Sequence, residues 1–321
     1  MKVADTDYAY SQSKIKALEK KLFDLQRLVL LAETKHIDDV YKTLADAGYP
    51  QHNDYTRMLN MSLDETYKLV KDISPDPEIF NVFLVKNDYH NLKVLIKAEF
   101  LGINPDSLLV SGGLIRVDEL KSSFTNRKLG SMPQTMQRAV KKALETFSVS
   151  NNPQAAEIIL DLAMYEQMVK MANETENSYI IGYVKKQIDL TNIKTLFRMK
   201  LQNKTEAFAK DTFIPNGSIS VDAFVRLMKT SPEETMAAIG KTGYAYIVED
   251  GFDMIKLEQK CNLDNFAYIK KGRGMYFGPE PLIAYMLSKE EEIKQLRIII
   301  SGKLGGVSEK IITERLNASY V

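Results

Sequence analysis

Apolar residues recur along this chain at spacings of three and four, with charged residues between them. The clearest series lies near the N-terminus and comprises Ile15, Leu18, Leu22, Leu25 and Val29. Such spacing places the apolar side chains on one face of an α-helix, so it predicts one long helix across this segment.

A basic flank accompanies this apolar face and leaves an alternative open. It consists of Lys14, Lys16, Lys20, Lys21 and Arg27. A basic amphipathic helix of this kind is typical of a membrane surface. Glu19 and Asp24 interrupt the basic side, however, and we favour a helix that packs within the protein.

Helix boundaries are marked at several later points. Asp76-Pro77-Glu78 and Ser231-Pro232-Glu233-Glu234 each supply an N-cap residue, a first-turn proline and a first-turn acid. Strict two-residue alternation is scarce, and residues 244–250 (YAYIVED) form the one segment that resembles a strand. The pattern therefore predicts an all-α fold.

A short polar motif occurs three times. DYHNLK at residues 88–93 returns as DLTNIK at 189–194 and, more loosely, as EIKQLR at 292–297. A second echo pairs GLIRVDEL at 113–120 with GSISVDAF at 217–224. Offsets of roughly a hundred residues correspond to domains, not solenoid repeats. We predict three related helical units near residues 1–100, 101–203 and 204–321, with pieces exchanged between them.

The motif places an acid and an amide three residues apart, on one helix face within an apolar stripe. Buried polar groups need partners, since an unpaired one costs roughly 1–3 kcal/mol. We interpret the pairs as a structural polar clamp that fixes how the helices of each unit meet, and not as a metal or acid–base site. The clamp residues are Asp88, Asn91, Asp189, Asn192, Glu292 and Gln295.

Composition excludes several classes of function. Lysine and arginine number 43 against 42 acidic residues, so no broad field for nucleic acid or anionic lipid is expected. One cysteine, Cys261, and three scattered histidines offer neither a disulfide nor a zinc site. We expect no catalytic residues, cofactor, metal or transmembrane segment.

Two basic glycine-containing segments leave an enzymatic alternative open. KKGRG at 270–274 and SGKLGG at 301–306 are expected to be flexible loops, and such loops bind phosphate in some enzymes. GKTG at 240–243 lacks the earlier glycine of a P-loop, and Gly240 is better explained as a helix C-cap. A nucleotide- or phosphate-binding enzyme and a generic helical adaptor are the alternatives.

The three motif copies, together with residues 8–49 and 277–306, resemble the C subunit of prokaryotic V/A-type ATPases, the counterpart of the eukaryotic V-ATPase d subunit. One departure is visible, because the acid and amide of the third copy, Glu292 and Gln295, are each a methylene longer than those of the others.

This resemblance implies three helical-bundle domains that form a funnel with pseudo-threefold symmetry. It implies a non-catalytic rotor protein, a socket that couples the D and F subunits of the central stalk to the membrane rotor ring of proteolipid c/K subunits. Such a socket transmits torque for ATP-linked proton or sodium transport. It is peripheral and lies on the cytoplasmic face of the membrane.

Overall fold

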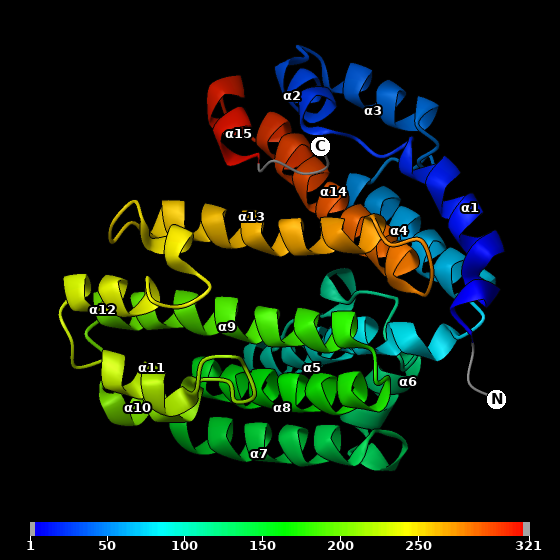
Figure 1. Ribbon diagram of the computed structural model, residues 1–321. Helices are drawn as coiled ribbons and strands as arrows, with labels where there is room; N and C mark the ends of the chain where they lie inside the picture. Colours follow the sequence, from blue (N-terminus) through cyan, green and yellow to red (C-terminus); the bar gives the residue numbers. More distant parts are fainter. Residues whose placement is uncertain (1–3, 317–321) are drawn as a thin grey trace. The chain divides into compact units, whose positions relative to one another are not determined.

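Every regular element between residues 4 and 316, the range that the computed structural model describes, is helical (Figure 1). The predicted all-α class is therefore confirmed. Residues 244–250 do not form a strand, because a short 3-10 helix, η5 (Ala245–Val248), occupies them. Ile247 and Val248 of this helix are buried next to each other, so the burial does not alternate as it would in a strand.

The contacts divide the chain into two compact units. Unit 1 contains residues 1–80 and 262–321, and unit 2 contains residues 81–261. The two ends of the sequence therefore belong to one unit. The division falls within α13 (Met254–Arg273), so that helix contributes to both units.

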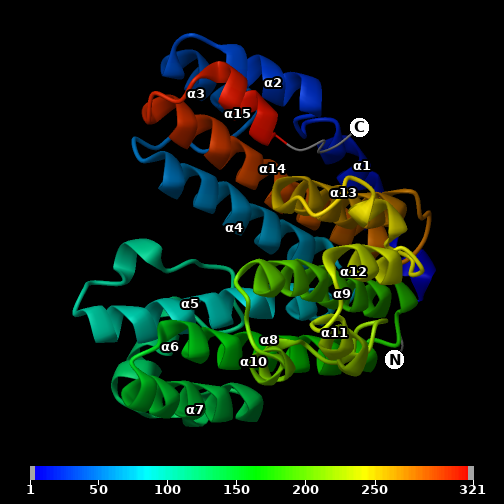
Figure 2. The same cartoon turned by 90° about the vertical axis from the view of Figure 1, so that its left-hand side faces the viewer.

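Unit 1 is organised around one helix, α14 (Glu280–Leu304), which is buried on nearly all sides of its first three turns. A helix that is apolar all round belongs at the centre of a core. Both views show α14 between α4 and a layer of α2, α3 and α15 (Figures 1 and 2). The surrounding elements are η1 (Asp5–Tyr8), α1 (Ala9–Glu19), α2 (Leu25–Glu33), α3 (Ile37–Asp46), α4 (Tyr55–Ile73), η2 (Pro77–Phe80) and α15 (Glu309–Arg315).

The predicted single helix across residues 15–29 is wrong, since α1 ends at Glu19 and α2 begins at Leu25. The break has two local causes. The Asp24 side chain accepts a hydrogen bond from the Arg27 backbone N–H and so caps α2. The backbone N–H of Phe23 points to a carboxylate from the other end of the chain, which a continuous helix does not permit.

Unit 2 contains two long buried helices, α5 (Asn81–Leu101) and α9 (Ser178–Leu201), each buried on several sides. α8 packs between α7 and α5 and also contacts α9. A separate apolar cluster joins α9 to the short helices that follow it. The remaining elements are η3 (Asp106–Leu108), α6 (Val117–Thr125), η4 (Leu129–Ser131), α7 (Gln134–Ser150), α8 (Pro153–Glu174), α10 (Glu206–Thr212), α11 (Val221–Leu227) and α12 (Pro232–Ile239).

The three long helices that carry the motif copies, α5, α9 and α14, end in the same way. Gly102, Asn203 and Gly306 each adopt a positive φ just beyond the helix, at 64°, 51° and 67°. The next backbone N–H then bonds to a carbonyl five residues back, as in a Schellman motif, in all three cases. The shared ending extends the correspondence of the three motif copies beyond the acid and the amide.

Candidate functional site

The first acid–amide pair ties α5 to the turn that precedes α6. Asp88 is fully buried, and its two carboxylate oxygens accept the backbone N–H groups of Leu114 at 2.8 Å and Ile115 at 3.2 Å. Asn91 holds the start of the same turn, because its side-chain amide donates to the Val110 carbonyl at 2.8 Å and accepts from the Val110 N–H at 2.9 Å. The pair thus satisfies both ends of one turn.

The second pair repeats this geometry between α9 and the turn before α11. Asp189 accepts the N–H groups of Ser218 at 3.0 Å and Ile219 at 3.1 Å, and Asn192 makes the reciprocal amide pair with Ile214 at 2.8 and 2.9 Å. The Tyr244 hydroxyl adds a third donor to Asp189, at 2.9 Å. The two repeated sequence patterns therefore form the two sides of one contact. The first pattern contains the acid and the amide, and the second contains the turn whose N–H groups the acid binds.

A glycine lies within each of these two turns, directly before the bound N–H groups, for a steric reason. A Cβ placed on Gly113 would lie 2.2 Å from the Asp88 Oδ1, and one on Gly217 would lie 2.2 Å from the Asp189 Oδ1. Only a residue without a side chain lets the backbone come this close to a carboxylate.

The third copy ties α14 to the N-terminal turn before α2. Glu292 accepts the Phe23 N–H at 2.5 Å, so residues at opposite ends of the sequence meet. The preceding N–H, that of Leu22, already bonds to the Glu19 carbonyl at the end of α1. The carboxylate therefore takes the Tyr49 hydroxyl and the Lys289 ammonium, the latter at 2.6 Å, in place of a second backbone donor.

The amide of the third copy has a different contact from the other two amides. The Gln295 side chain is buried and donates to the Glu291 carboxylate at 3.0 Å. The longer side chains of Glu292 and Gln295 are thus accompanied by a changed set of partners.

Burial makes the electrostatics of this third site distinctive. It raises the pKa of Tyr49 well above its ordinary value, and the charge and hydrogen bond of Glu292 act in the same direction. Burial also lowers the pKa of Lys289, although Glu292 opposes that shift. The Lys289 ammonium lies over the Tyr49 ring, 3.9 Å from its centroid, so the three side chains form one compact charged group.

A second tie, which the repeated motif did not indicate, connects the far end of each long helix. On α9, the Lys200 ammonium donates to the carbonyls of Leu227 at 2.8 Å and Thr230 at 2.6 Å, at the end of α11. On α14, Lys303 donates to the Thr34 carbonyl at the end of α2. A cation is favoured at a helix C-terminus, where carbonyls lack partners.

In the first copy the charges of the second tie are reversed. The long helix supplies an acid, and the neighbouring segment supplies the cation. Glu99 on α5 binds Arg127, whose guanidinium also donates to the Phe124 carbonyl at 2.8 Å, at the end of α6. Glu99, Lys200 and Lys303 occupy the same position relative to the three acids, so aligning the copies further along each helix would have found them.

Two side chains near the first pair have ordinary roles. The His90 ring nitrogen lies 3.2 Å from the Leu108 carbonyl at the surface, away from any catalytic partner. Lys93 binds Asp161 on α8 at 2.7 Å and is half-buried.

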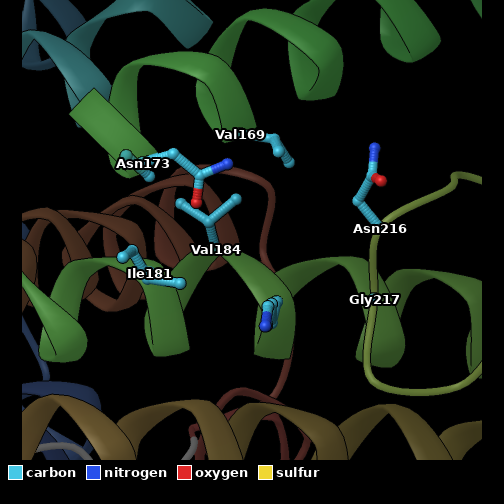
Figure 3. A pocket seen from close by; sticks show the side chains of 8 residues that line it. Val169, Asn173, Ile181, Val184, Asn216 and Gly217 are labelled. Carbon is cyan, nitrogen blue, oxygen red and sulfur yellow. The ribbon is translucent and has the colours of Figure 1, made fainter. Parts of the chain in front are cut away.

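A small pocket of about 320 Å³ opens in unit 2 between α8, α9 and the turn at residues 216–217. Asn173 extends from α8 and Asn216 from the turn, with Val169, Ile181 and Val184 around them (Figure 3). Lys185 supplies the one charge in the lining. This lining contains no acid, thiol or imidazole beside Lys185, so it holds no paired acid–base or nucleophile–base arrangement.

The two basic segments predicted to be flexible loops are largely helical, which corrects that expectation. Residues 270–273 belong to the last turn of α13, and residues 301–304 belong to the last turn of α14. Gly302 serves packing, because a Cβ there would lie 2.8 Å from the Ile312 side chain on α15. Gly240 ends α12, as expected of a C-cap.

Residues 4–316 contain neither a cluster of metal ligands nor a membrane-spanning helix. No three acidic, histidine or cysteine side chains in that range are grouped as metal ligands. Within the same range, no helix has the length and hydropathy required to cross a bilayer.

Known proteins resemble this chain over most of its length. The model of the ATP synthase (C/AC39) subunit family matches residues 12–315. The C subunit of the V-type sodium ATPase of Enterococcus hirae is 25% identical over 317 residues, which cover 95% of this chain and 97% of that protein. The C subunit of the A-type ATP synthase of Methanocaldococcus jannaschii is 26% identical, with 96% and 86% covered, and that of Pyrococcus furiosus is 23% identical, with 92% and 86% covered.

The family match includes all six clamp residues and all three long helices. It confirms the resemblance drawn from the three motif copies. The chain therefore belongs to the C/AC39 subunit family of the ATP synthase, a structural and non-catalytic subunit of that complex.

Proposed function

We propose that this chain is the rotor socket of a V/A-type ATPase, the part that couples the central stalk to the membrane ring. Its partners in this proposal are the D and F subunits of the stalk and the proteolipid c/K ring, on the cytoplasmic face of the membrane. The family match over residues 12–315 is the observation that carries the proposal. Proton or sodium transport coupled to ATP is the resulting activity of the whole complex.

The polar clamp supplies a mechanical reason for this role. Torque transfer requires a body whose helices do not slide past one another under load. Apolar packing has little directional preference, whereas a buried carboxylate with two backbone donors holds one register only. Each long helix is tied at the clamp and again near its C-terminal end, and two separated ties resist rotation better than one.

We retain as proposals the three units near residues 1–100, 101–203 and 204–321, and their arrangement as a pseudo-threefold funnel. The shared Schellman endings and the second ties of the three long helices support a threefold repeat. In the third unit the clamp joins Glu292 to Phe23, so exchanged pieces from both ends of the chain are part of the proposal.

Exposed leucines near the ends of the three long helices are suited to contacts with permanent partners. Leu101, Leu201 and Leu304, near the ends of the three long helices, are all more than half exposed. Rotor interfaces are obligate, and such interfaces are richer in apolar side chains than ordinary surfaces. We propose these helix ends as partner contacts.

Co-expression with the stalk and ring proteins tests the socket role. We expect the tagged chain to capture the D and F subunits and the ring, and the Leu201→Asp and Leu304→Asp variants to lose at least one of them. The matched control is Val149→Asp, an exposed apolar residue outside the proposed contacts. Recovery of unrelated proteins alone would indicate a generic adaptor, and a nucleotide-dependent rise in melting temperature would indicate an enzyme.

Removal of the clamp acid should destabilise the fold. Asp88→Ala or Asn91→Ala leaves buried backbone groups without partners, so we expect a loss of roughly 1–3 kcal/mol in the free energy of unfolding. Denaturant titration measures this loss, with the exposed Asp211→Ala as control. Unfolding curves like those of the wild type would show that the clamp does not stabilise unit 2.

Filling the space beside the acid should have a similar effect. Gly113→Ala and Gly217→Ala force a methyl group against a carboxylate, and overpacking of this kind costs about 1–3 kcal/mol. Gly130→Ala is the control, because a Cβ there has no atom within 4 Å. Equal melting temperatures for Gly113→Ala and Gly130→Ala would argue against the close contact.

The Tyr49 site should make stability depend on alkaline pH. Its raised pKa means that the folded state holds the proton more tightly, so its contribution is complete below about pH 10 and is lost as pH rises above it. We expect Tyr49→Phe to be less stable than wild type at pH 7, with a difference that narrows above about pH 10. A constant difference across this range would mean that Tyr49 is not buried beside Glu292.

A further inference from the structure

The connection between α13 and α14 in unit 1 displays three consecutive apolar side chains to solvent. Met275, Tyr276 and Phe277 are 40%, 81% and 61% exposed. Exposed large apolar side chains in a row are unfavourable in water and usually mark a contact surface. No contact described above accounts for these three.

Both ends of this connection are anchored on α1. The Gln12 side chain donates to the Gly278 carbonyl at 3.2 Å, and the Lys16 ammonium donates to the Arg273 carbonyl at 2.9 Å. Gln12 and Lys16 are four residues apart and share one helix face. In Figure 1 the orange connection lies beside α1, in agreement with these bonds. The apolar tip is therefore a fixed protrusion.

Basic side chains surround the tip. Lys20 is the C-cap residue of α1, four residues after Lys16, and Lys270 and Lys271 lie in the last turn of α13. All three are exposed, and none forms an ion pair with a carboxylate in the described part of the chain. Two acids lie near the tip. Glu19 is buried and already binds Arg273 at 3.2 Å and Lys16 at 3.5 Å, and Glu280 is half-buried in the first turn of α14.

We propose that this corner of unit 1 binds the surface of an anionic lipid bilayer, with Tyr276 and Phe277 inserted at the headgroup level. An exposed apolar tip can insert into a bilayer, and aromatic side chains favour the boundary between headgroups and hydrocarbon. The exposed lysines attract anionic headgroups, and an apolar anchor combined with basic residues is a typical arrangement of peripheral binding. The basic flank of α1 and the KKGRG segment, separate in sequence, contribute to one surface.

The charge around the tip distinguishes it from another pair of exposed apolar side chains. Leu101 and Ile103 in unit 2 are flanked by Lys97, Glu99 and Asp106, a mixture of both signs that suits a protein partner. The tip of unit 1 has exposed positive charge beside it, which favours a lipid surface over a protein.

Vesicle flotation of the isolated full chain tests this proposal independently of the stalk and ring. We expect binding to phosphatidylcholine vesicles that contain phosphatidylglycerol, no binding to phosphatidylcholine alone, and weaker binding as salt rises. Tyr276→Ser with Phe277→Ser, and Lys270→Glu with Lys271→Glu, should each lower the partition coefficient by at least about tenfold.

Two matched variants control for general effects. Lys141→Glu with Lys142→Glu makes the same charge change on the exposed face of α7, and Val149→Ser removes exposed apolar surface in unit 2. Both should float like the wild type. The chain has no tryptophan, so Phe277→Trp provides a single reporter whose emission should shift to the blue on anionic vesicles.

Absence of wild-type flotation, or flotation of both tip variants at the wild-type level, would overturn the lipid proposal. An unchanged emission of the Phe277→Trp variant on bound vesicles would also overturn it. Capture of the stalk proteins by a chain that fails to float would leave the socket role standing, so the two failures are distinguishable.

Discussion

The structure depends on one kind of interaction, a buried carboxylate on a long helix that binds the backbone N–H groups of a distant turn. Asp88, Asp189 and Glu292 each satisfy donors that no regular element serves. In a buried environment of low polarity, neither the carboxylate nor the backbone N–H groups have an alternative partner. Breaking the contact therefore leaves both without a hydrogen bond. The contact therefore sets the position of the turn, and the turn sets where the next helix begins.

The third contact shows how the same requirement is met with different residues. One backbone donor is already used at the end of α1, so Glu292 recruits a tyrosine hydroxyl and a lysine. A longer acid reaches this dispersed set of donors. Glu292 and Phe23 lie at opposite ends of the sequence. Their contact therefore holds the segment between α1 and α2 against α14, as a covalent cross-link between the two would do.

The acids and amides could be singled out from the sequence because their helix spacing places polar groups within an apolar stripe, a conflict visible without coordinates; their role as a clamp stays a prediction. It did not predict the break at residues 20–24, since a local apolar period cannot reveal that Glu292 competes for the Phe23 N–H. The turn of the third copy lies before α2, not after α14, so a search for a third echo downstream of residue 297 could not find it. The residues near helix ends were missed because Glu99 reverses the charge of Lys200 and Lys303.

The buried polar clamps fix the packing of the helices, whereas the exposed apolar side chains are available to bind partners. The proposed role needs both features. A rotor protein must bind its partners through exposed apolar side chains. Its own helices must nevertheless keep their packing and not repack against those side chains. Directional hydrogen bonds inside each unit meet the second condition, because they penalise every register except one, whereas apolar packing tolerates several. The clamp thus allows the helix ends and the aromatic tip to remain apolar without loosening the units that display them.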